Sequence, residues 1–313
     1  MFFRNKYFLL LSFAILLIGI PAASGMISGV SAQTTTAVPE IIHVGIYVQD
    51  FNDFKVDEGT IESTFYLTLI SDTNISMDDI EIMNGQATSV EAIPDNIAGK
   101  EYKITATLTV DPDLHRFPFD RHTVPIEIEP KLQNEKLMVL VIDPEDSGLD
   151  SEADLPGWEL TRTSSDITNK SYLPGEVPFS RAVFGYVIER DAASTVLKFF
   201  LPIMLIIVVA LSSLMIKISS RLGLNASMFL AAVLIHWRVS EALPLVAYAT
   251  FLDLFMIITY ATLVMVLVSG ILILKFTETK DQERIGLVNR WSIRIIPTLS
   301  LTLYCLLFLS LLL

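Results

Sequence analysis

Residues 196–216 read VLKFFLPIMLIIVVALSSLMI, an apolar run whose only charge, Lys198, stands near its start. About 20 apolar residues span a bilayer as a helix, so this run is long enough to do so. Three further apolar runs, at residues 222–237, 254–274 and 295–313, hold no charged residue. The C-terminal part of the chain is therefore predicted to form a four-helix transmembrane domain. Its helices are expected near residues 196–216, 221–241, 248–274 and 292–313.

Basic residues between these runs set the expected orientation. The second connection is short and contains Glu241, whereas the first and third are rich in basic residues: Lys217, Arg221, Lys275, Lys280, Arg284, Arg290 and Arg294. Cytoplasmic connections carry an excess of Lys and Arg, so the first and third are predicted to face the cytoplasm. Residues 33–190 then lie outside the cell membrane, in the extracellular or periplasmic space.

The N-terminus gives an independent indication of the same topology. Arg4 and Lys6 precede an uncharged run at residues 7–20, and Val30-Ser31-Ala32 offers the small residues that a signal peptidase reads. The run is short for a membrane span. Residues 1–32 are predicted to be a cleaved signal peptide, with an uncleaved anchor as the alternative.

Composition excludes several classes of protein. Residues 33–190 hold 11 basic and 29 acidic residues, a net charge of −18, and no dense basic patch that would favour a nucleic-acid partner. The one cysteine, Cys305, allows no intrachain disulfide. The four histidines do not have metal-ligand spacing, and no hydrolase or phosphate-binding motif is present. We therefore expect no catalytic, cofactor-binding or metal site, and no enzyme activity.

The region before the membrane helices has the pattern of half-buried strands. Apolar and polar residues alternate at 42–46, 104–110, 124–128 and 183–188, with turn signals such as Asn84-Gly85 between the strands. Short strands at this spacing predict an antiparallel β-sandwich over residues 33–190. The membrane domain is predicted at residues 191–313, and only residues 191–195 separate the last strand from its first helix.

The segment Phe117-Pro118-Phe119-Asp120, about 80 residues before Phe200-Leu201-Pro202-Ile203, resembles the signature loop of pentameric ligand-gated ion channels, the Cys-loop receptor superfamily. Further matches are Pro156-Gly157-Trp158-Glu159, Arg190, residues 243–250 (LPLVAYAT) and Asp253. The resemblance places the bridging cysteines of the family at Val110 and Val124, so the chain is similar to prokaryotic members without that disulfide. It implies a homopentamer in the plasma membrane that conducts inorganic ions.

One interval departs from the family pattern. Only about 45 residues lie between the second strand, near residues 65–70, and Phe117. The resemblance then implies that strands which supply part of the agonist pocket are shortened or missing. The agonist is not identified and is expected to be either a small molecule or a proton.

The resemblance implies that the second helix lines the pore. Helical spacing places one stripe of residues on the axis of the assembly: Gly223, Ser227, Leu230, Leu234, Trp237 (or Arg238) and Glu241. Rings of Leu230 and Leu234 would close the pore by excluding water. Alternatively, these leucines pack against neighbouring helices.

Ion selectivity and pH sensing stay undecided. Ser219-Ser220 stand where cation-conducting relatives usually carry an acidic residue. Arg238 and Glu241 fit either a salt bridge or a charged ring at the outer mouth. His236 fits either a packed side chain or a proton sensor.

The resemblance also implies a coupling site between the two domains. Asp120 and Arg190 are expected to form a partly buried ion pair there. Phe117, Pro118 and Phe119 are expected to press on the connection at residues 242–248, which Pro244 stiffens. The alternative is that the ion pair only holds a turn. For the whole protein, the alternative to a ligand-gated channel is a non-conducting membrane sensor or adhesion protein.

Overall fold

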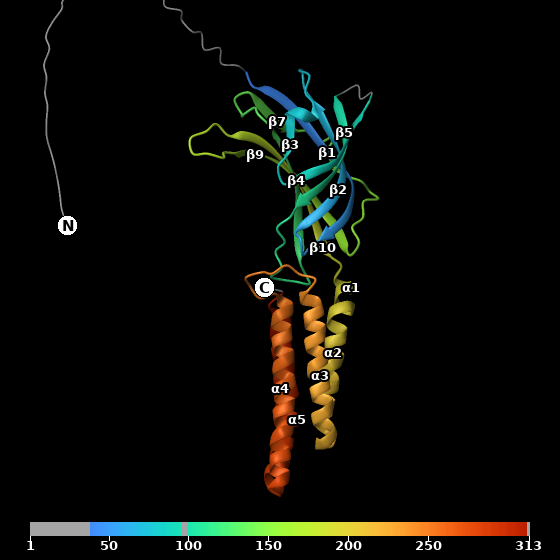
Figure 1. The fold of residues 1–313 in the computed structure, drawn as a ribbon, viewed down its shortest axis with the longest axis vertical. Helices are drawn as coiled ribbons and strands as arrows, with labels where there is room; N and C mark the ends of the chain where they lie inside the picture. Colours follow the sequence, from blue (N-terminus) through green and yellow to red (C-terminus); the bar gives the residue numbers. More distant parts are fainter. Residues whose placement is uncertain (1–37, 95–98, 312–313) are drawn as a thin grey trace, which may run out of the picture. The chain divides into compact units, whose positions relative to one another are not determined.

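The structure is a computed structural model that describes residues 38–94 and 99–311. The predicted signal peptide at residues 1–32 lies outside the described residues and stays a prediction. In the described ranges, the strands come first and the long helices follow (Figure 1). The strands are β1 (Glu40–Lys55), β2 (Thr60–Ile70), β3 (Ile80–Ile82), β4 (Gly85–Ile93), β5 (Lys100–Thr109), β6 (Arg121–Pro130), β7 (Met138–Ile142), β8 (Gly148–Leu149), β9 (Trp158–Lys170) and β10 (Phe179–Arg190). The helices are α1 (Ala192–Thr195), α2 (Leu201–Ser212), α3 (Ile218–Ser240), α4 (Phe251–Glu278) and α5 (Gln282–Leu309).

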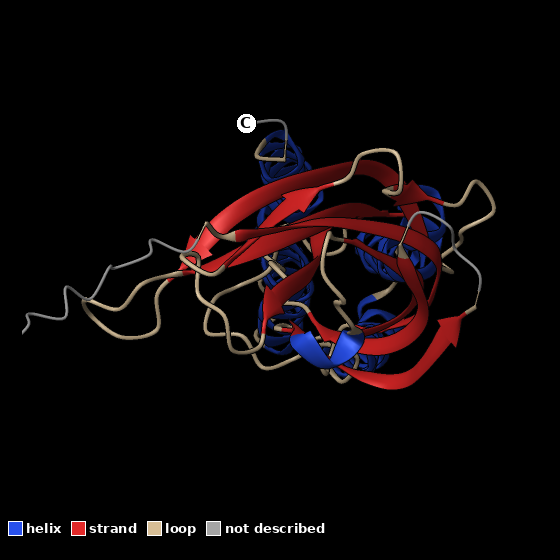
Figure 2. Ribbon diagram, turned by 90° about the horizontal axis from the view of Figure 1, so that it is seen from above, coloured by secondary structure: helices blue, strands red, loops and turns tan. Residues whose placement is uncertain are grey.

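The strands form two sheets, seen from above in Figure 2, and one apolar core lies between them. One sheet has the order β4-β5-β2-β1-β7, with β8 also paired to β1, and the other has the order β3-β6-β10-β9. Alternate residues of the central strands point inward, as in Ile104, Ala106 and Leu108 of β5. The sandwich predicted from this alternation is confirmed.

The sandwich is not wholly antiparallel. Residues 40–44 of β1 pair in parallel with β7, and Tyr47-Val48 pair in parallel with β8. Apolar alternation reports which face of a strand is buried but not the direction in which the strand runs. The expectation of a purely antiparallel sandwich was therefore wrong at this edge.

The interval between β2 and Phe117, expected to have shortened or missing strands, contains three strands. β3 is short, whereas β4 and β5 pair along residues 85–93 and 101–108. β5 also pairs with β2 from Thr60 to Leu69. The short β3 and the connection of only residues 83–84 between β3 and β4 account for part of the small number of residues in this interval.

A single residue joins the sandwich to the membrane helices. β10 ends at Arg190 and α1 begins at Ala192. The Asp191 N–H donates to the Gly157 carbonyl (3.0 Å), and Asp191 Oδ1 accepts from the Ala193 N–H (3.0 Å). Asp191 is therefore held on the sandwich side and also caps α1.

Pro202 sets the local geometry of the first membrane helix. Residues 196–200 form a π-helical turn, and Pro202 stands in the first turn of α2. A proline has no N–H to donate and its ring clashes with the carbonyl four residues earlier, so the preceding turn widens.

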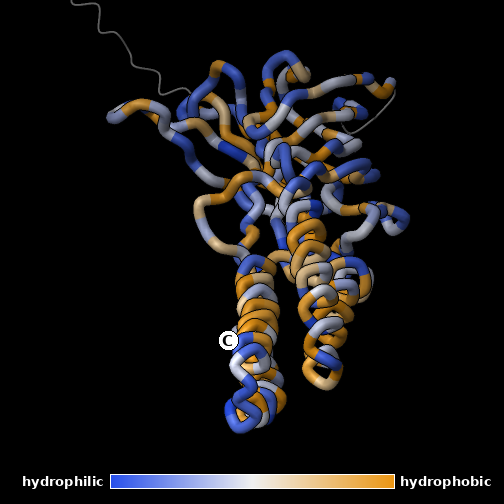
Figure 3. The backbone as a smooth tube through the Cα atoms, turned by 60° about the horizontal axis from the view of Figure 1, so that its bottom comes forward, coloured by the Kyte–Doolittle hydropathy of each residue, from blue (hydrophilic) through white to orange (hydrophobic). Residues whose placement is uncertain are grey.

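In the described part of the chain, four helical segments are long and apolar enough to cross a membrane: residues 193–215, α3, α4 and α5. Figure 3 shows hydrophobic residues along them. α4 begins at Phe251 because Thr250 and Asp253 form a capping box, and α5 begins at Gln282 because Asp281 accepts from the Arg284 N–H. α4 continues beyond its predicted end at residue 274, and α5 begins before its predicted start at residue 292. Hydropathy marks only the apolar part of a helix and therefore missed these extensions.

Candidate functional site

The segment between β5 and β6, residues 111–120, contacts the start of α4 and is called here the junction loop. The Phe251 N–H donates to the His115 carbonyl (2.9 Å), and the Leu252 N–H donates to the Phe117 carbonyl (3.1 Å). The first N–H groups of a helix have no partner inside that helix. The junction loop supplies two of the missing acceptors, so it is fixed to α4 through its backbone.

Aromatic side chains extend this contact to the first membrane helix. Phe117 lies edge-on to Phe199, and Phe119 stacks on Phe200, both with ring centroids 5.7 Å apart. Phe119 also meets Phe251 of α4, at 5.6 Å. One buried apolar cluster thus contains the junction loop together with the ends of two membrane helices.

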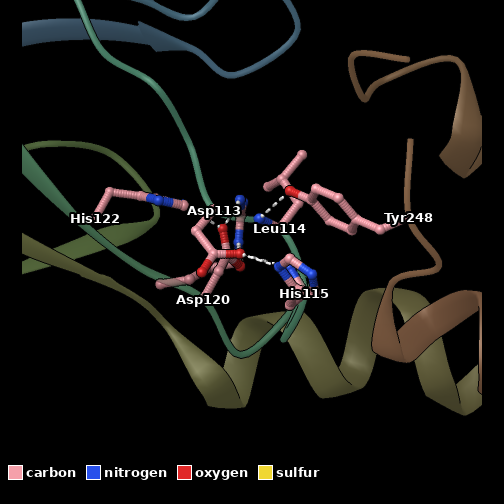
Figure 4. Close-up of polar contacts among 7 residues, drawn as sticks. Asp113, Leu114, His115, Asp120, His122 and Tyr248 are labelled. Atoms are coloured by element: carbon pink, nitrogen blue, oxygen red, sulfur yellow. Dashed lines mark hydrogen bonds and ion pairs between the residues drawn. The ribbon is translucent and has the colours of Figure 1, made fainter. Parts of the chain in front are cut away.

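His115 and Leu114 reach the α3–α4 connection through Tyr248 (Figure 4). The His115 and Tyr248 rings stack with centroids 3.7 Å apart and an interplanar angle of 6°. The Leu114 N–H donates to the Tyr248 Oη (3.0 Å). The junction loop therefore contacts this connection through Leu114 and His115, whereas the ring contacts of Phe117 and Phe119, which were expected to press on it, are with Phe199, Phe200 and Phe251. Pro244 is half-buried in the connection, and Pro118 follows a cis Phe117–Pro118 peptide bond.

The predicted Asp120–Arg190 pair is present and is bidentate. Arg190 Nε donates to Asp120 Oδ1 (2.7 Å), and Arg190 Nη2 donates to Asp120 Oδ2 (2.9 Å). The Asp120 side chain is fully buried, whereas that of Arg190 is 15% exposed. The guanidinium also lies 4.1 Å from the centroid of the Trp158 ring. Parallel hydrogen bonds and an aromatic face make this a strongly held ion pair.

His122 contributes a third contact to the same carboxylate. Its Nε2 lies 2.6 Å from Asp120 Oδ2, and its ring is also buried. Burial acts to raise the pKa of Asp120, but the hydrogen bonds and charges of Arg190 and His122 outweigh it and lower that pKa to about 2. Asp120 is thus ionised throughout the physiological pH range.

The predicted pore-lining residues share one exposed face of α3. We call Gly223, Ser227, Leu230, Leu234, Trp237 and Glu241 the outer face of α3; each is exposed, with Leu230 at 60% and Trp237 at 62%. The opposite side packs on the other helices, and Ala232 there is fully buried. Arg238 is also exposed and forms an ion pair with Glu241 (3.6 Å).

His236 lies away from the outer face and against α4. Its Nδ1 is 3.0 Å from Tyr260 Oη, and its Nε2 is 3.3 Å from Asp253 Oδ1. The packed interpretation of His236 fits these contacts. Among residues 38–94 and 99–311, no three His, Cys, Asp or Glu side chains gather as a metal ion would require.

One residue of the site, His122, was not singled out from the sequence, whereas Trp158 and Tyr248 lie in segments matched to the family but had no assigned partner. His122 and Trp158 complete the surroundings of the Asp120–Arg190 pair, and Tyr248 binds the junction loop. His122 had a local signal, because it stands two residues after Asp120 and strand alternation places both on one face. The family resemblance marked the segment that contains Tyr248, but no local pattern indicated its partners, which lie more than 130 residues earlier.

Comparisons with known proteins give a distant match. No protein-family profile matches the chain. The gamma-aminobutyric acid receptor subunit beta of Caenorhabditis elegans is 22% identical over 218 residues, which is 67% of this chain and 39% of that protein. The chain thus matches about two fifths of the length of this relative. With the sandwich and the four apolar helices, this likeness fits a multi-pass plasma-membrane protein with an extracellular sandwich, and not an enzyme.

Proposed function

We propose that the chain is a subunit of a ligand-gated ion channel, in which five copies place the outer face of α3 around a central water path. The observation that carries this proposal is the contrast between α3 and α4. Within its apolar run α4 turns the hydroxyl residues Thr259, Thr262 and Ser269 inward, away from lipid, and its exposed Thr277 stands at the helix end. α3 exposes Ser227 inside its span, Ser219 and Ser220 at its start, and Ser240 with the following Glu241 at its end.

An exposed row of polar groups is costly in lipid but not in water. The outward surfaces of α2 and α4 carry residues such as Leu205, Val208 and Ile257, which suit acyl chains. α3 is also the least covered by its own chain of the four candidate spans. Assembly around α3 gives its polar positions water and leaves the apolar helices to face the bilayer.

Leu230 and Leu234 supply the gate in this proposal. They lie one turn apart on the outer face of α3 and are 60% and 51% exposed. Copies of these side chains around an axis form two apolar rings, and a narrow apolar constriction expels water. The proposal does not choose between a cation and an anion as the permeant ion, because Ser219 and Ser220 carry no charge.

The junction loop supplies the coupling in this proposal. It is fixed to the sandwich by the Asp120–Arg190 pair and to α4 by two backbone hydrogen bonds. Binding of a small extracellular molecule or a proton would shift the sandwich, and the junction loop would move the start of α4 and the end of α3. The relative is named as a receptor for a small amino acid, which supports a small ligand as the stimulus.

The first test measures current and accessibility on the purified full chain in a planar bilayer. In a Cys305→Ser background, Ser227→Cys is expected to be modified by a charged methanethiosulfonate reagent, with loss of current. Ala232→Cys is the matched control, because Ala232 is fully buried in the same helix and should not react. Equal reaction at both positions, or no effect of modified Ser227→Cys on current, would overturn the proposed pore.

The second test addresses the gate. Leu234→Ser is expected to raise the unstimulated current, because a hydroxyl keeps the constriction wet. Val233→Ser, at an exposed neighbouring position off the stripe, should leave that current near wild type. The mass of the detergent-solubilised assembly should equal five chains. A stable monomer or dimer without current would favour the sensor or adhesion protein.

A further inference from the structure

Arg221 is the largest fully buried side chain of the described residues, with only 1% of its surface exposed. It stands in the first turn of α3, at the end of the helix away from the sandwich. Its Nη2 donates to Ser269 Oγ of α4. Its Nε has no hydrogen-bond partner within the described part of the chain. A buried guanidinium normally has all its donors satisfied and its charge paired, whereas Arg221 has one donor without a partner and no ion pair among the described residues.

Arg221 is among the residues that line a cavity between the start of α3, the end of α4 and the start of α5. The cavity measures about 360 Å³, which is within the range of small-molecule sites. Its polar lining includes Thr277, Gln282 and Asn289, which can donate hydrogen bonds. Among the described residues that line it, Arg221 is the only charged one. The cavity therefore combines one positive charge with several neutral donors.

The helix start adds to this positive character. Lys217 stands at the N-cap of α3 and makes no side-chain capping bond there. The first N–H groups of a helix carry partial positive charge and attract anions. A basic side chain in this turn is unfavourable unless an anion is present, whereas Asp281 caps the neighbouring start of α5.

We propose that this cavity binds a phosphate-bearing anion, with the Arg221 guanidinium as its main ligand. The planar fork of arginine matches the oxygens of phosphate, and the free Nε is one arm of that fork. The site lies outside the proposed pore and junction loop, so it does not depend on channel activity.

A second groove favours a phospholipid as the carrier of the phosphate. This groove lies between α4 and α5, measures about 330 Å³, and is lined mainly by apolar side chains such as Val264, Val268 and Ile295. Ser269, which accepts the hydrogen bond from Arg221, also lines it. An anionic lipid could place its phosphate at Arg221 and an acyl chain in the groove.

The test measures ligand binding to the full chain, purified in detergent and stripped of lipid, by native mass spectrometry. The probes are dioctanoyl phosphatidylglycerol, dioctanoylglycerol, which lacks the phosphate, and inorganic phosphate. Wild type is expected to bind the phosphatidylglycerol and not the dioctanoylglycerol. Arg221→Gln should weaken this binding about tenfold to a hundredfold, as expected for a charged hydrogen bond. Arg284→Gln is the matched control, because it removes an exposed charge at the same end of α5 outside the cavity.

A second pair of variants keeps the test decisive if Arg221→Gln does not fold. A Cβ added at Gly286, which lines the cavity, would meet no atom within 4 Å. Gly286→Leu should fill the cavity and abolish binding, whereas Gly286→Ala should retain it. Inorganic phosphate that binds as tightly as the lipid, and is lost in the same variants, would support the site with free phosphate as its ligand. Unchanged lipid binding in Gly286→Leu or in folded Arg221→Gln would overturn the proposal.

Discussion

Arg190 and Arg221 are both arginines with little exposed surface, but their charges have different partners within the chain. Arg190 has a bidentate carboxylate and an aromatic face, and the carboxylate is further held by His122. Arg221 has one serine hydroxyl and a free Nε. Removal of a charge from water costs several kcal/mol per ion unless partners compensate. The first arginine is therefore part of the folded framework, whereas the second has hydrogen-bonding capacity for something outside the chain.

The largest expected effect follows from breaking the Arg190 pair. Asp120→Asn leaves the guanidinium without its counter-charge, so the free energy of unfolding should fall by about 3–5 kcal/mol. Urea unfolding of the detergent-solubilised protein measures this change. Loss of stimulus-evoked current at normal surface expression would further support the coupling role. A loss of stability below 1 kcal/mol would contradict the view that this pair belongs to the framework.

Acid should break the same pair without a mutation. The pKa of Asp120 is lowered to about 2 in the fold from an unfolded value of 3.8. A lowered carboxyl pKa stabilises the fold above the unfolded value, and that contribution is lost as pH falls toward 2. The loss should amount to about 2 kcal/mol between pH 5 and 2, and should be absent in Asp120→Asn. Unfolding curves across pH in both proteins measure it, and an equal slope in both would rule out Asp120 as its source.

Removal of the charge at Arg221 is expected to change stability in the opposite direction. Arg221→Met keeps a long side chain but removes an unpaired buried charge, so stability in lipid-free detergent should stay the same or rise by about 1 kcal/mol. Thermal or urea unfolding of the two proteins checks this. A loss of several kcal/mol would mean that Arg221 is already satisfied within the chain, which would remove the distinction between the two arginines.

The smallest effect is expected at an exposed pair beside Arg190. Arg121 Nη1 lies 3.4 Å from Glu189 Oε1, with both side chains well exposed. Surface pairs contribute about 0–1 kcal/mol. Arg121→Gln should therefore change the unfolding free energy by less than about 1 kcal/mol, measured beside Asp120→Asn. A comparable loss in both variants would show that burial does not determine the difference.

Residue periodicity predicted the sandwich and the membrane helices, because both signals are local. Alternation at residues 104–110 requires only that one face of the strand is buried, and an uncharged run such as 254–274 requires only a lipid-like environment. The charged extensions at the shared end of α4 and α5 were missed because hydropathy does not report them. The parallel pairing of β1 with β7 was missed because burial carries no information about strand direction.

At the site, one contact was expected before the structure, whereas the burial of Arg221 was not. Asp120 and Arg190 were expected to pair, and the structure shows that they do. The resemblance of the loop to a known family carried that expectation, since 70 residues separate the partners. The burial of Arg221 had no local signal, because its position before an apolar run is equally typical of a basic residue facing the cytoplasm. Only the packing of α3 on α4 places it inside.

The one-residue joint at Asp191 limits how the length of this chain can change. Each residue of a helix turns the next by about 100°, so one residue inserted between Arg190 and Ala192 would rotate every later side chain of the first membrane helix relative to the sandwich. Phe199 and Phe200 would then leave Phe117 and Phe119. Insertions and deletions should therefore be tolerated in hairpins such as residues 171–178, but not at this joint, where chain length sets the angular phase between two domains.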